Sequence, residues 1–556
     1  MSASGSASTA EGAGSDRDAR RLRRRWRAAV VFLALLGGGL VLLATAKYGA
    51  GLTTDSVAYL DVARSLASGK GYIFHTGEPL IYWPPLYPML LALVGIATGL
   101  DPSSFAAIVN AILFGLLILL SAHLFRTGFR LTNACSVLGV CAMVFSVPLS
   151  GIYAMTWSEC LFIPLVALCL VCAQRYWENR SVVTLAIMAI STALACLTRY
   201  IGVALVPTGI LVLVLAPGAN RRTRFVRASA FAIISLAPLG LWLLHNYQQA
   251  GTLSGDRFHP VFEFVTNTIL LVTSMLSWYE PLGLAVKSAS GAGTQAVRSA
   301  SLSINLFVAL AGTCALATAL VLSRTVRTRL SRALKAVLWH HQPAVIFLAV
   351  YSAALVLLAA RGASSFVDQR LLSPLFVPAT LLLLKLAHSV LGQERTNPTA
   401  LARNMPLVLL SLWLCFPLAW VLRSTARRYE NGAGGYNTRT WRESETIARA
   451  RRVPSANGGN HLYSNGRDAL WALARVNASW LPSRVAVPLS DLRGRWPDDG
   501  ASVVVWFDSI TWRKNLFSVE ELGEISNVEK VAQLKDGSIY RVSVRETPVQ
   551  DLTFPR

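Results

Sequence analysis

Charged residues are scarce in this chain of 556 residues. Asp, Glu, Lys and Arg make up 15% of it, whereas 53% of the residues are hydrophobic and the mean hydropathy is +0.47. Acidic residues are scarcer than basic ones, with 29 Asp and Glu against 52 Lys and Arg. In a soluble chain the formal charge of +23 would suggest a nucleic-acid partner, but the basic residues lie mostly between long apolar segments. The composition therefore predicts a membrane protein and no nucleic-acid partner.

Cysteine is absent beyond Cys415, and all eight cysteines fall in or beside apolar stretches. Their spacing lacks the paired Cys and His pattern of a zinc site. A disulfide framework is not expected, and the thiols are predicted to pack as small apolar groups. The last part of the chain also lacks a glycine-rich phosphate loop, a metal-binding cluster and a nucleophile with its base.

The N-terminus combines a Ser-, Gly- and Ala-rich lead with a block of arginines that ends at Arg27. We expect residues 1–27 to be disordered. The apolar run 28–46 is longer than the core of a signal peptide, so it is predicted to remain as an uncleaved signal anchor. Positively charged flanks stay inside, which places this N-terminus in the cytoplasm.

Long uncharged stretches recur up to residue 422, and their lengths suit a hydrocarbon core about 30 Å thick. They predict about eleven transmembrane helices, near 28–46, 104–125, 133–153, 158–174, 181–198, 201–218, 228–247, 302–322, 343–360, 371–390 and 405–422. With the N-terminus inside, the inner segments hold 22 Lys and Arg and the outer segments before the tail hold 9, as the positive-inside rule requires. The short apolar stretches 85–100 and 262–278 are expected on or in the outer surface; if either one spans, all later loops change sides.

The tail, residues 423–556, has ordinary polar composition and predicts a soluble α/β domain on the extracytoplasmic side. Strands are expected at 461–464 and 503–507, and Asp536-Gly537 predicts a hairpin turn. The basic run from Arg423 to Arg428 conflicts with this placement, because positively charged flanks of membrane spans stay on the cytoplasmic side. The expected fold is a polytopic α-helical membrane domain, 28–422 with an outer loop at 47–103, followed by this soluble domain.

The outer loop contains the most informative pattern. Residues 55–67 have helical apolar spacing and predict an amphipathic helix on the membrane surface, stopped by the glycines of Gly69-Lys70-Gly71-Tyr72. The segment Tyr82-Trp83-Pro84-Pro85-Leu86-Tyr87-Pro88 follows. Asp55 lies in the first turn of the helix, where an acid can simply cap the helix and interact with its dipole.

Taken together, Asp55, Tyr59, the glycine turn and the Pro-rich segment resemble the first outer loop of polyprenyl-phosphate-sugar-dependent glycosyltransferases of the GT-C class. The likeness is to the bacterial family 39 group, which includes protein O-mannosyltransferases and lipid A aminoarabinose transferases. Further matching pieces follow in order along the chain: Ser158-Glu159, Leu197-Thr198-Arg199-Tyr200, Asn246-Tyr247, Gly255-Asp256-Arg257 and Asp368-Gln369-Arg370-Leu371-Leu372-Ser373-Pro374.

The resemblance implies an integral membrane glycosyltransferase of the plasma (inner) membrane. It would move a hexosyl or pentosyl group, with inversion, from a polyprenyl-phosphate-linked donor to a lipid, glycan or protein acceptor on the extracytoplasmic side. Such transfer needs a base for the acceptor proton and cations for the leaving phosphate. The implied catalytic carboxylates are Asp55, as base, and Glu159, which would position the acceptor or a metal. The implied phosphate-binding residues are Arg199, Arg257 and Arg370; those for the acceptor or sugar are Tyr59, Tyr82 and Asp368.

One departure from the family pattern and two rival functions stay open. Related enzymes often carry a Lys or His in or beside the Pro-rich segment, and here the nearest basic candidate is His75. Lys70 and His259 are weaker candidates for the same task. No cofactor is assigned, and a divalent metal stays an open alternative. A transporter or lipid flippase without transferase activity is one rival function; a sensor or assembly scaffold is the other.

Overall fold

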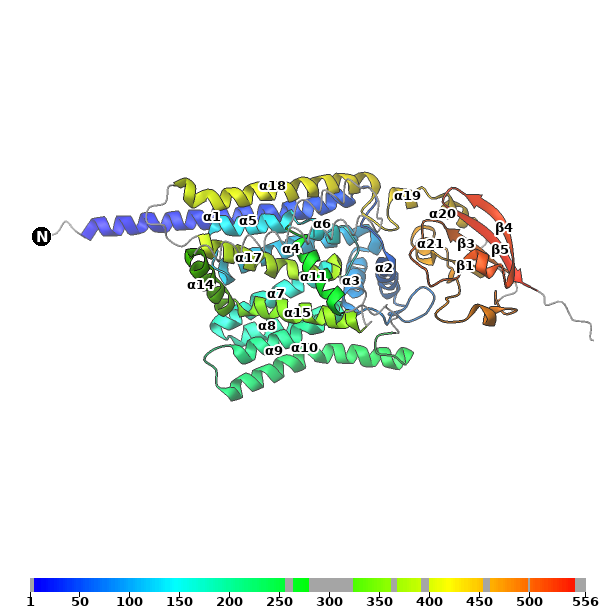
Figure 1. The fold of residues 1–556 in the computed structure, drawn as a ribbon, viewed down its shortest axis with the longest axis horizontal. Helices are drawn as coiled ribbons and strands as arrows, with labels where there is room; N and C mark the ends of the chain where they lie inside the picture. Colours follow the sequence, from blue (N-terminus) through cyan, green and yellow to red (C-terminus); the bar gives the residue numbers. More distant parts are fainter. Residues whose placement is uncertain are drawn as a thin grey trace, which may run out of the picture.

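The computed structural model of the protein describes residues 5–255, 264–279, 324–361, 368–391, 400–453, 461–498 and 501–545. Long helices run side by side in one bundle, and a sheet-containing unit lies at one end of it (Figure 1). The bundle helices are α1 (Gly5–Thr45), α4 (Pro102–His123), α5 (Asn133–Val144), α6 (Val147–Tyr153), α7 (Glu159–Asn179), α8 (Val182–Thr198), α9 (Leu205–Leu215), α10 (Arg221–Ala250), α11 (Phe264–Leu276), α14 (Arg324–His340), α15 (Gln342–Ala360), α17 (Phe376–Leu391) and α18 (Ala400–Asn431).

Six helical stretches in the described part of the chain are long and apolar enough to cross a membrane, or seven if the bent pair α5 and α6 forms one span. The six are Arg20–Thr45, Pro102–Gly128, Glu159–Asn179, Arg221–Ala250, Gln342–Ala360 and Gln369–His388. The protein is therefore a multi-pass membrane protein. The predicted count of eleven is not confirmed, because several predicted spans are short helices or broken ones, and the predicted span 302–322 lies outside the described residues.

The N-terminus differs from the expectation of disorder. Helix α1 continues without a break from Gly5 through the arginine block into the apolar run. Ala and Arg are both good helix formers, so the apolar helix can extend into the basic segment. The N-terminal end of α1 and the sheet-containing unit lie at opposite ends of the bundle (Figure 1).

The predicted outer-loop helix forms as α2 (Thr54–Ala67). A capping box closes its first turn, because Thr53 and Ser56 satisfy each other's backbone N–H groups. The helix ends at Ala67, and Gly69, two residues later, turns the chain with a φ of +74°, which suits glycine. Helix α2 is not an open surface helix as predicted: residues 56–63 are all buried, since the bundle packs on one side and the C-terminal part on the other.

Helix α3 (Leu86–Thr98) packs against α2 and follows the Pro-rich segment. Its 13 residues span only about 20 Å, less than the hydrocarbon core of about 30 Å. At the same end of the bundle as α2, α16 (Gln369–Leu372) and the 3-10 turn Ser373–Leu375 lead into α17. Helices α2 and α16 carry two of the acidic and basic side chains discussed below.

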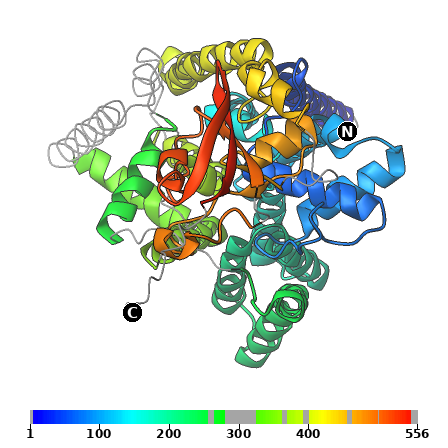
Figure 2. The ribbon, with the colours of Figure 1, turned by 90° about the vertical axis from the view of Figure 1, so that its right-hand side faces the viewer.

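The C-terminal part contains a five-stranded sheet in the order β2-β1-β3-β5-β4. Strand β1 is parallel to β2 and β3, whereas β3, β5 and β4 are antiparallel neighbours. Figure 2 looks onto this sheet from its outer side, with the helical bundle behind it. The elements are α19 (Arg439–Arg442), α20 (Glu445–Ala450), β1 (His461–Ser464), α21 (Arg467–Ala474), β2 (Ser479–Trp480), β3 (Ala501–Phe507), α22 (Val519–Leu522), β4 (Ser526–Leu534) and β5 (Gly537–Val544). The predicted strands and the β4–β5 hairpin are thus present.

The glycine-rich segment after α18 is held tightly against the chain that precedes α2. Leu52 N donates to Gly434 O at 3.2 Å, and Tyr436 N donates to Leu52 O at 2.7 Å. Gly435 has φ +59°, and a Cβ there would lie 1.8 Å from Leu52 O, so only glycine fits. Asn437 Nδ2 donates to Ala50 O at 2.8 Å. This segment therefore positions the C-terminal part against the outer loop.

A buried carboxylate makes the second attachment. Asp61 on α2 accepts hydrogen bonds from His75 N at 2.9 Å, from His75 Nδ1 at 2.7 Å and from Trp471 Nε1 on α21 at 2.8 Å. The His75 and Trp471 rings stack with centroids 3.5 Å apart. Burial raises the pKa of Asp61, but the hydrogen bonds and the positive charge of His75 outweigh it and hold that pKa below its usual value.

Asp61→Asn should loosen the C-terminal part from α2, because an NH2 group that cannot accept replaces one of the two accepting oxygens and leaves at least one buried donor unpaired. We expect a destabilisation of about 2 kcal/mol, seen as a lower melting temperature and faster proteolytic release of the C-terminal part. The lowered pKa makes this attachment complete above about pH 4, the pKa of an unfolded Asp, and weaker as the pH falls through the folded pKa. Asp508→Asn, at an exposed site, is the matched control; equal behaviour of the two variants would contradict the assignment.

Candidate active site

Two predicted carboxylates lie at the first turns of two helices near the end of the bundle that faces the C-terminal part. Asp55 is in the first turn of α2, and Glu159 is the first residue of α7. Both helix starts favour negative charge, because unpaired N–H groups and the helix dipole point toward them. The side chain of Asp55 is 23% exposed, whereas that of Glu159 is 1% exposed.

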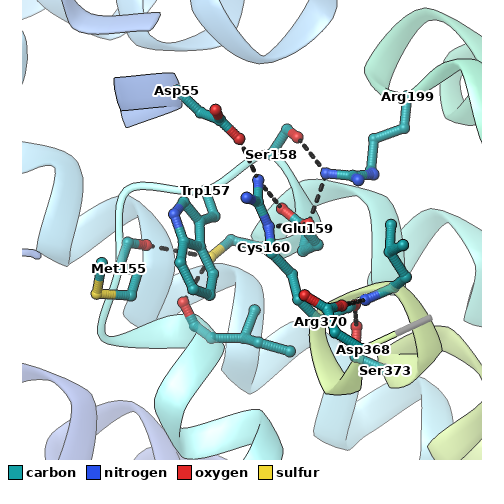
Figure 3. A network of polar contacts seen from close by, with 12 residues as sticks. Asp55, Met155, Trp157, Ser158, Glu159, Cys160, Arg199, Asp368, Arg370 and Ser373 are labelled. Atoms are coloured by element: carbon teal, nitrogen blue, oxygen red, sulfur yellow. Dashed lines mark hydrogen bonds and ion pairs between the residues drawn. The ribbon is translucent and has the colours of Figure 1, made fainter. Parts of the chain in front are cut away.

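Arg370, on α16, joins these carboxylates. Its Nη2 atom lies 2.8 Å from Asp55 Oδ2 and donates to Glu159 Oε2 at 3.2 Å, and its Nε donates to Glu159 Oε1. Figure 3 shows the guanidinium between the two acids. The pair Arg370 and Glu159 is separated by 211 residues in sequence. One guanidinium therefore ties together α2, α7 and α16.

Arg199 completes the charge balance. It follows α8 in an extended conformation, and its Nη1 lies 2.5 Å from Glu159 Oε1 and donates to Ser158 Oγ at 3.1 Å. The Tyr59 hydroxyl lies 3.2 Å from the same Ser158 Oγ. The result is a half-buried cluster of two carboxylates and two guanidiniums, which we call the charge cluster (Asp55, Glu159, Arg199 and Arg370). Burial raises the pKa of Tyr59, so its hydroxyl keeps its proton.

Trp157 supports the charge cluster and was not among the predicted site residues. The Arg370 Cζ atom lies 4.3 Å from the centroid of the Trp157 ring, a cation–π contact. The indole Nε1 donates to Thr53 Oγ1 at 2.9 Å, and Thr53 caps α2. Trp157 therefore fixes the guanidinium and the start of α2 together. Its place beside Ser158-Glu159 was the only sequence signal that could have indicated it.

Two of the predicted acceptor or sugar residues lie apart from the charge cluster. The Asp368 carboxylate caps α16 by accepting from Leu371 N at 2.8 Å, beside Ser373 in Figure 3. Burial raises the pKa of Asp368. Tyr82 is 41% exposed and lines a separate cavity. Tyr59, the third, contacts the charge cluster through Ser158.

Some predicted basic residues are not in the cluster. Arg257 and His259 lie outside the described residues. His75, considered as a substitute for the missing base near the Pro-rich segment, is bound to Asp61 and stacked on Trp471 instead. Lys70 is an exposed residue after α2.

An apolar groove of about 720 Å³ opens beside the charge cluster. Arg199 and Arg361 line it, and more than half of the other lining residues are Leu, Ile or Val, mainly from α10, α15 and the 3-10 turn Tyr200–Ala204. Tyr200 closes one side: its hydroxyl donates to Ile81 O at 3.0 Å and accepts from Asn246 Nδ2 at 3.3 Å. The groove thus combines an apolar wall with guanidinium groups, which suits a lipid with an anionic head group.

Within the described ranges, no group of three or more His, Cys, Asp and Glu side chains is placed to hold a metal ion. The two carboxylates of the charge cluster are bridged by Arg370, so their charges are compensated by the protein itself.

No protein-family model and no curated protein matches the chain. Among solved structures, the chain is similar to ArnT from Cupriavidus metallidurans in the apo state, with a TM-score of 0.57 and 12% identity over 93% of this chain and 98% of that one. The same protein bound to undecaprenyl phosphate gives a TM-score of 0.57 at 12% identity, over 96% of this chain and 99% of that one. Arabinofuranosyltransferase AftD from Mycobacteria, with a TM-score of 0.47 and 13% identity over 94% of this chain and 42% of that one, is too distant to carry an argument.

The likeness to ArnT extends over nearly the whole of both chains and shows a shared fold. The predicted fold, a polytopic helical part followed by a small C-terminal part with a sheet, is therefore confirmed and is similar to that of ArnT.

Glu159→Gln should destabilise the protein, because it leaves the guanidiniums of Arg199 and Arg370 partly buried with half of their negative counter-charge removed. We expect a loss of about 3 kcal/mol, measured as a lower melting temperature in detergent micelles. Glu443→Gln removes an exposed carboxylate from an ion pair with Arg439 and is the matched control; its melting temperature should not change measurably. A Glu159→Gln protein as stable as this control would contradict a charge-balancing role.

Proposed function

We propose that the protein is an integral membrane glycosyltransferase that transfers a sugar from a polyprenyl-phosphate-linked donor to an acceptor on the extracytoplasmic side. The observation that supports this most strongly is the position of the charge cluster beside an apolar groove. The groove suits a polyprenyl chain, the arginines suit its phosphate, and Asp55 supplies a carboxylate 2.8 Å from one of these arginines, Arg370.

The donor would lie with its isoprenoid chain along the Leu-rich walls of the groove and its phosphate near Arg199. A guanidinium stays charged and matches phosphate oxygens with paired N–H groups. Arg361 lines the same groove and could supply a second cation; sequence reasoning did not select it. That ArnT has been solved with undecaprenyl phosphate supports the same donor class for this fold.

Arg370 links donor binding to catalysis in this proposal. In the structure its guanidinium is shared by Asp55 and Glu159. A donor phosphate that approaches Arg370 would compete with Asp55 for the same Nη2 group. Asp55 would then be released from its ion pair and able to accept a proton, at the moment when donor is present.

The transfer step would be a single displacement. Asp55 takes the proton from the acceptor hydroxyl, the acceptor oxygen bonds to the anomeric carbon, and the bond from that carbon to the phosphate oxygen breaks. Polyprenyl phosphate leaves with the electron pair, stabilised by Arg199 and Arg370. Attack opposite the leaving group inverts the anomeric centre.

Glu159 has a different role in this proposal from that of Asp55. Its side chain is almost fully buried, and both its oxygens accept from Arg370. It would therefore position the two arginines rather than exchange protons with the acceptor.

The position of the charge cluster also bears on sidedness and on the rival functions. The basic end of α1 lies at the end of the bundle away from the cluster, and the C-terminal part lies at the same end as the cluster (Figure 1). With the N-terminus cytoplasmic, both the cluster and the C-terminal part would be extracytoplasmic. A transporter or flippase would need ionisable groups along a path between the two ends, whereas this cluster is gathered at one end.

Asp55→Asn should reduce transfer by at least about a hundredfold, because an amide cannot act as the base. The measurement is label transfer in proteoliposomes from radiolabelled polyprenyl-phosphate mannose, glucose, galactose, arabinose and aminoarabinose to a cell-envelope extract. Asp508→Asn is the control and should transfer at the normal rate.

Donor turnover by the wild type that is lost only in Asp55→Asn would support the proposal. Turnover retained in Asp55→Asn would contradict the assignment of Asp55 as the base. No turnover of any donor by folded wild-type protein, combined with movement of labelled lipid between leaflets, would favour the flippase.

A further inference from the structure

A second cavity, of about 490 Å³, lies between the outer loop and the C-terminal part. One wall comes from α2 and from the loop that carries His75, Glu78 and Tyr82. The other wall comes from α21 and the neighbouring strand β2, with Arg467 and Trp480. We call this space the interdomain cavity.

Helix α2 separates the interdomain cavity from the charge cluster. Thr54, Val57, Ala58 and Asp61 line the cavity, and their spacing of three and four residues places them along one face of the helix. Asp55, on a different face, points to Arg370 (Figure 3). A molecule in the cavity would therefore lie against the helix that carries the proposed base.

The cavity also adjoins the lipid groove. Trp83 lines both spaces, so a single side chain forms their common wall. Tyr82 lies on the cavity side and packs against Gly255, which lines the groove; a Cβ at Gly255 would lie 2.5 Å from the Tyr82 ring. A ligand of the cavity and a lipid in the groove would meet near Trp83.

The walls of the cavity combine aromatic rings with hydrogen-bonding groups. The rings are those of Phe74, Tyr82, Trp83, Trp471 and Trp480. Aromatic faces pack against the C–H faces of sugar rings, and carboxylate, hydroxyl and guanidinium groups can bond the sugar hydroxyls. Glu78 is exposed at the cavity and has no side-chain partner among the described residues.

The charges of the cavity argue against a phosphorylated ligand. Three acids, Asp61, Glu78 and Asp468, line it together with Arg467 and His75. Asp468 is paired with Arg513, whose Nη2 lies 2.6 Å from its Oδ2, and Asp61 is paired with His75, so the bases do not exceed the acids. The Arg467 Cζ atom lies 4.9 Å from the Trp480 ring centroid, so this guanidinium packs near the ring and its N–H groups can bond a sugar hydroxyl. The pair of guanidiniums that phosphate favours is in the charge cluster, not here.

We propose that the interdomain cavity binds an uncharged saccharide of the acceptor, whose reacting hydroxyl extends past Thr54, at the start of α2, to the adjacent Asp55. The proposal rests on the proposed function only in calling the ligand an acceptor. The C-terminal part then selects the acceptor, because Arg467, Trp471 and Trp480 belong to it.

Saturation-transfer NMR on the full-length protein in nanodiscs tests this without any donor. The probes are uncharged mannobiose, galactobiose and arabinobiose, each compared with mannose 6-phosphate and glucose 6-phosphate. At least one uncharged disaccharide should bind, and the phosphorylated sugars should bind more weakly.

Tyr82→Ala and Glu78→Gln should each lower the affinity for the disaccharide by about tenfold, since each removes a contact between the cavity wall and the sugar. Trp512→Ala removes an exposed aromatic ring outside the cavity and should leave binding unchanged. Melting temperatures show whether each variant is folded. If Tyr82→Ala is not folded, Glu78→Gln, at an exposed position, still tests the proposal.

Binding of an uncharged saccharide that both cavity variants weaken, and Trp512→Ala does not, would support the proposal. Tighter binding of a phosphorylated sugar, no binding of any uncharged disaccharide, or binding that Glu78→Gln leaves unchanged would overturn it. Asp55→Asn should still bind the disaccharide, so a failure of the proposed catalytic role would be seen in the transfer assay and not here.

Discussion

The guanidinium of Arg370 is the interaction on which the rest of the site depends. It lies between Asp55 on α2 and Glu159 on α7, and it packs on the ring of Trp157. Such a group is costly to bury unless its charge is compensated, so the structure must keep both carboxylates close to it. Because the three side chains come from separate helices, this requirement also fixes how α2, α7 and α16 meet.

Two spaces adjoin this arrangement. Arg199 of the charge cluster lines the apolar groove, whereas α2 lines the interdomain cavity together with aromatic residues of the C-terminal part. The C-terminal part is held in place by Asp61, by Gly435 and by Arg513, whose Nη2 also donates to Thr54 Oγ1 at 3.2 Å. Thr54 precedes Asp55 directly, so displacement of the C-terminal part would disturb the start of the helix that carries the proposed base.

Part of this site was accessible from the sequence because its residues lie near the ends of apolar segments. Glu159 and Arg199 stand out as charges that flank long uncharged runs, and Asp55 follows the first span with a helical pattern behind it. The strands and hairpin of the tail were predictable for a related reason, since alternation and the Asp536-Gly537 turn are local signals.

The rest depends on contacts between distant segments, which no local pattern encodes. The pairing of Arg370 with Glu159 crosses 211 residues, and the binding of Trp471 to Asp61 crosses 410. The burial of α2 was missed because its outer face is covered by the C-terminal part. The count of eleven spans is not confirmed, and the sequence did not show that the run 133–153 is bent by 52°. Tyr82 was predicted to bind the acceptor or sugar, and its location in a cavity apart from the charge cluster required the three-dimensional structure.

The central claim is that a donor phosphate replaces Asp55 as the partner of Arg370. The most direct test is an electron cryomicroscopy structure of the full-length protein in nanodiscs with undecaprenyl phosphate. The account predicts lipid density in the groove, the phosphate in contact with Arg199 and Arg370, and a separation of Asp55 from Arg370 beyond the 2.8 Å of the present ion pair. A phosphate bound away from these arginines, with the Asp55–Arg370 pair intact, would contradict it.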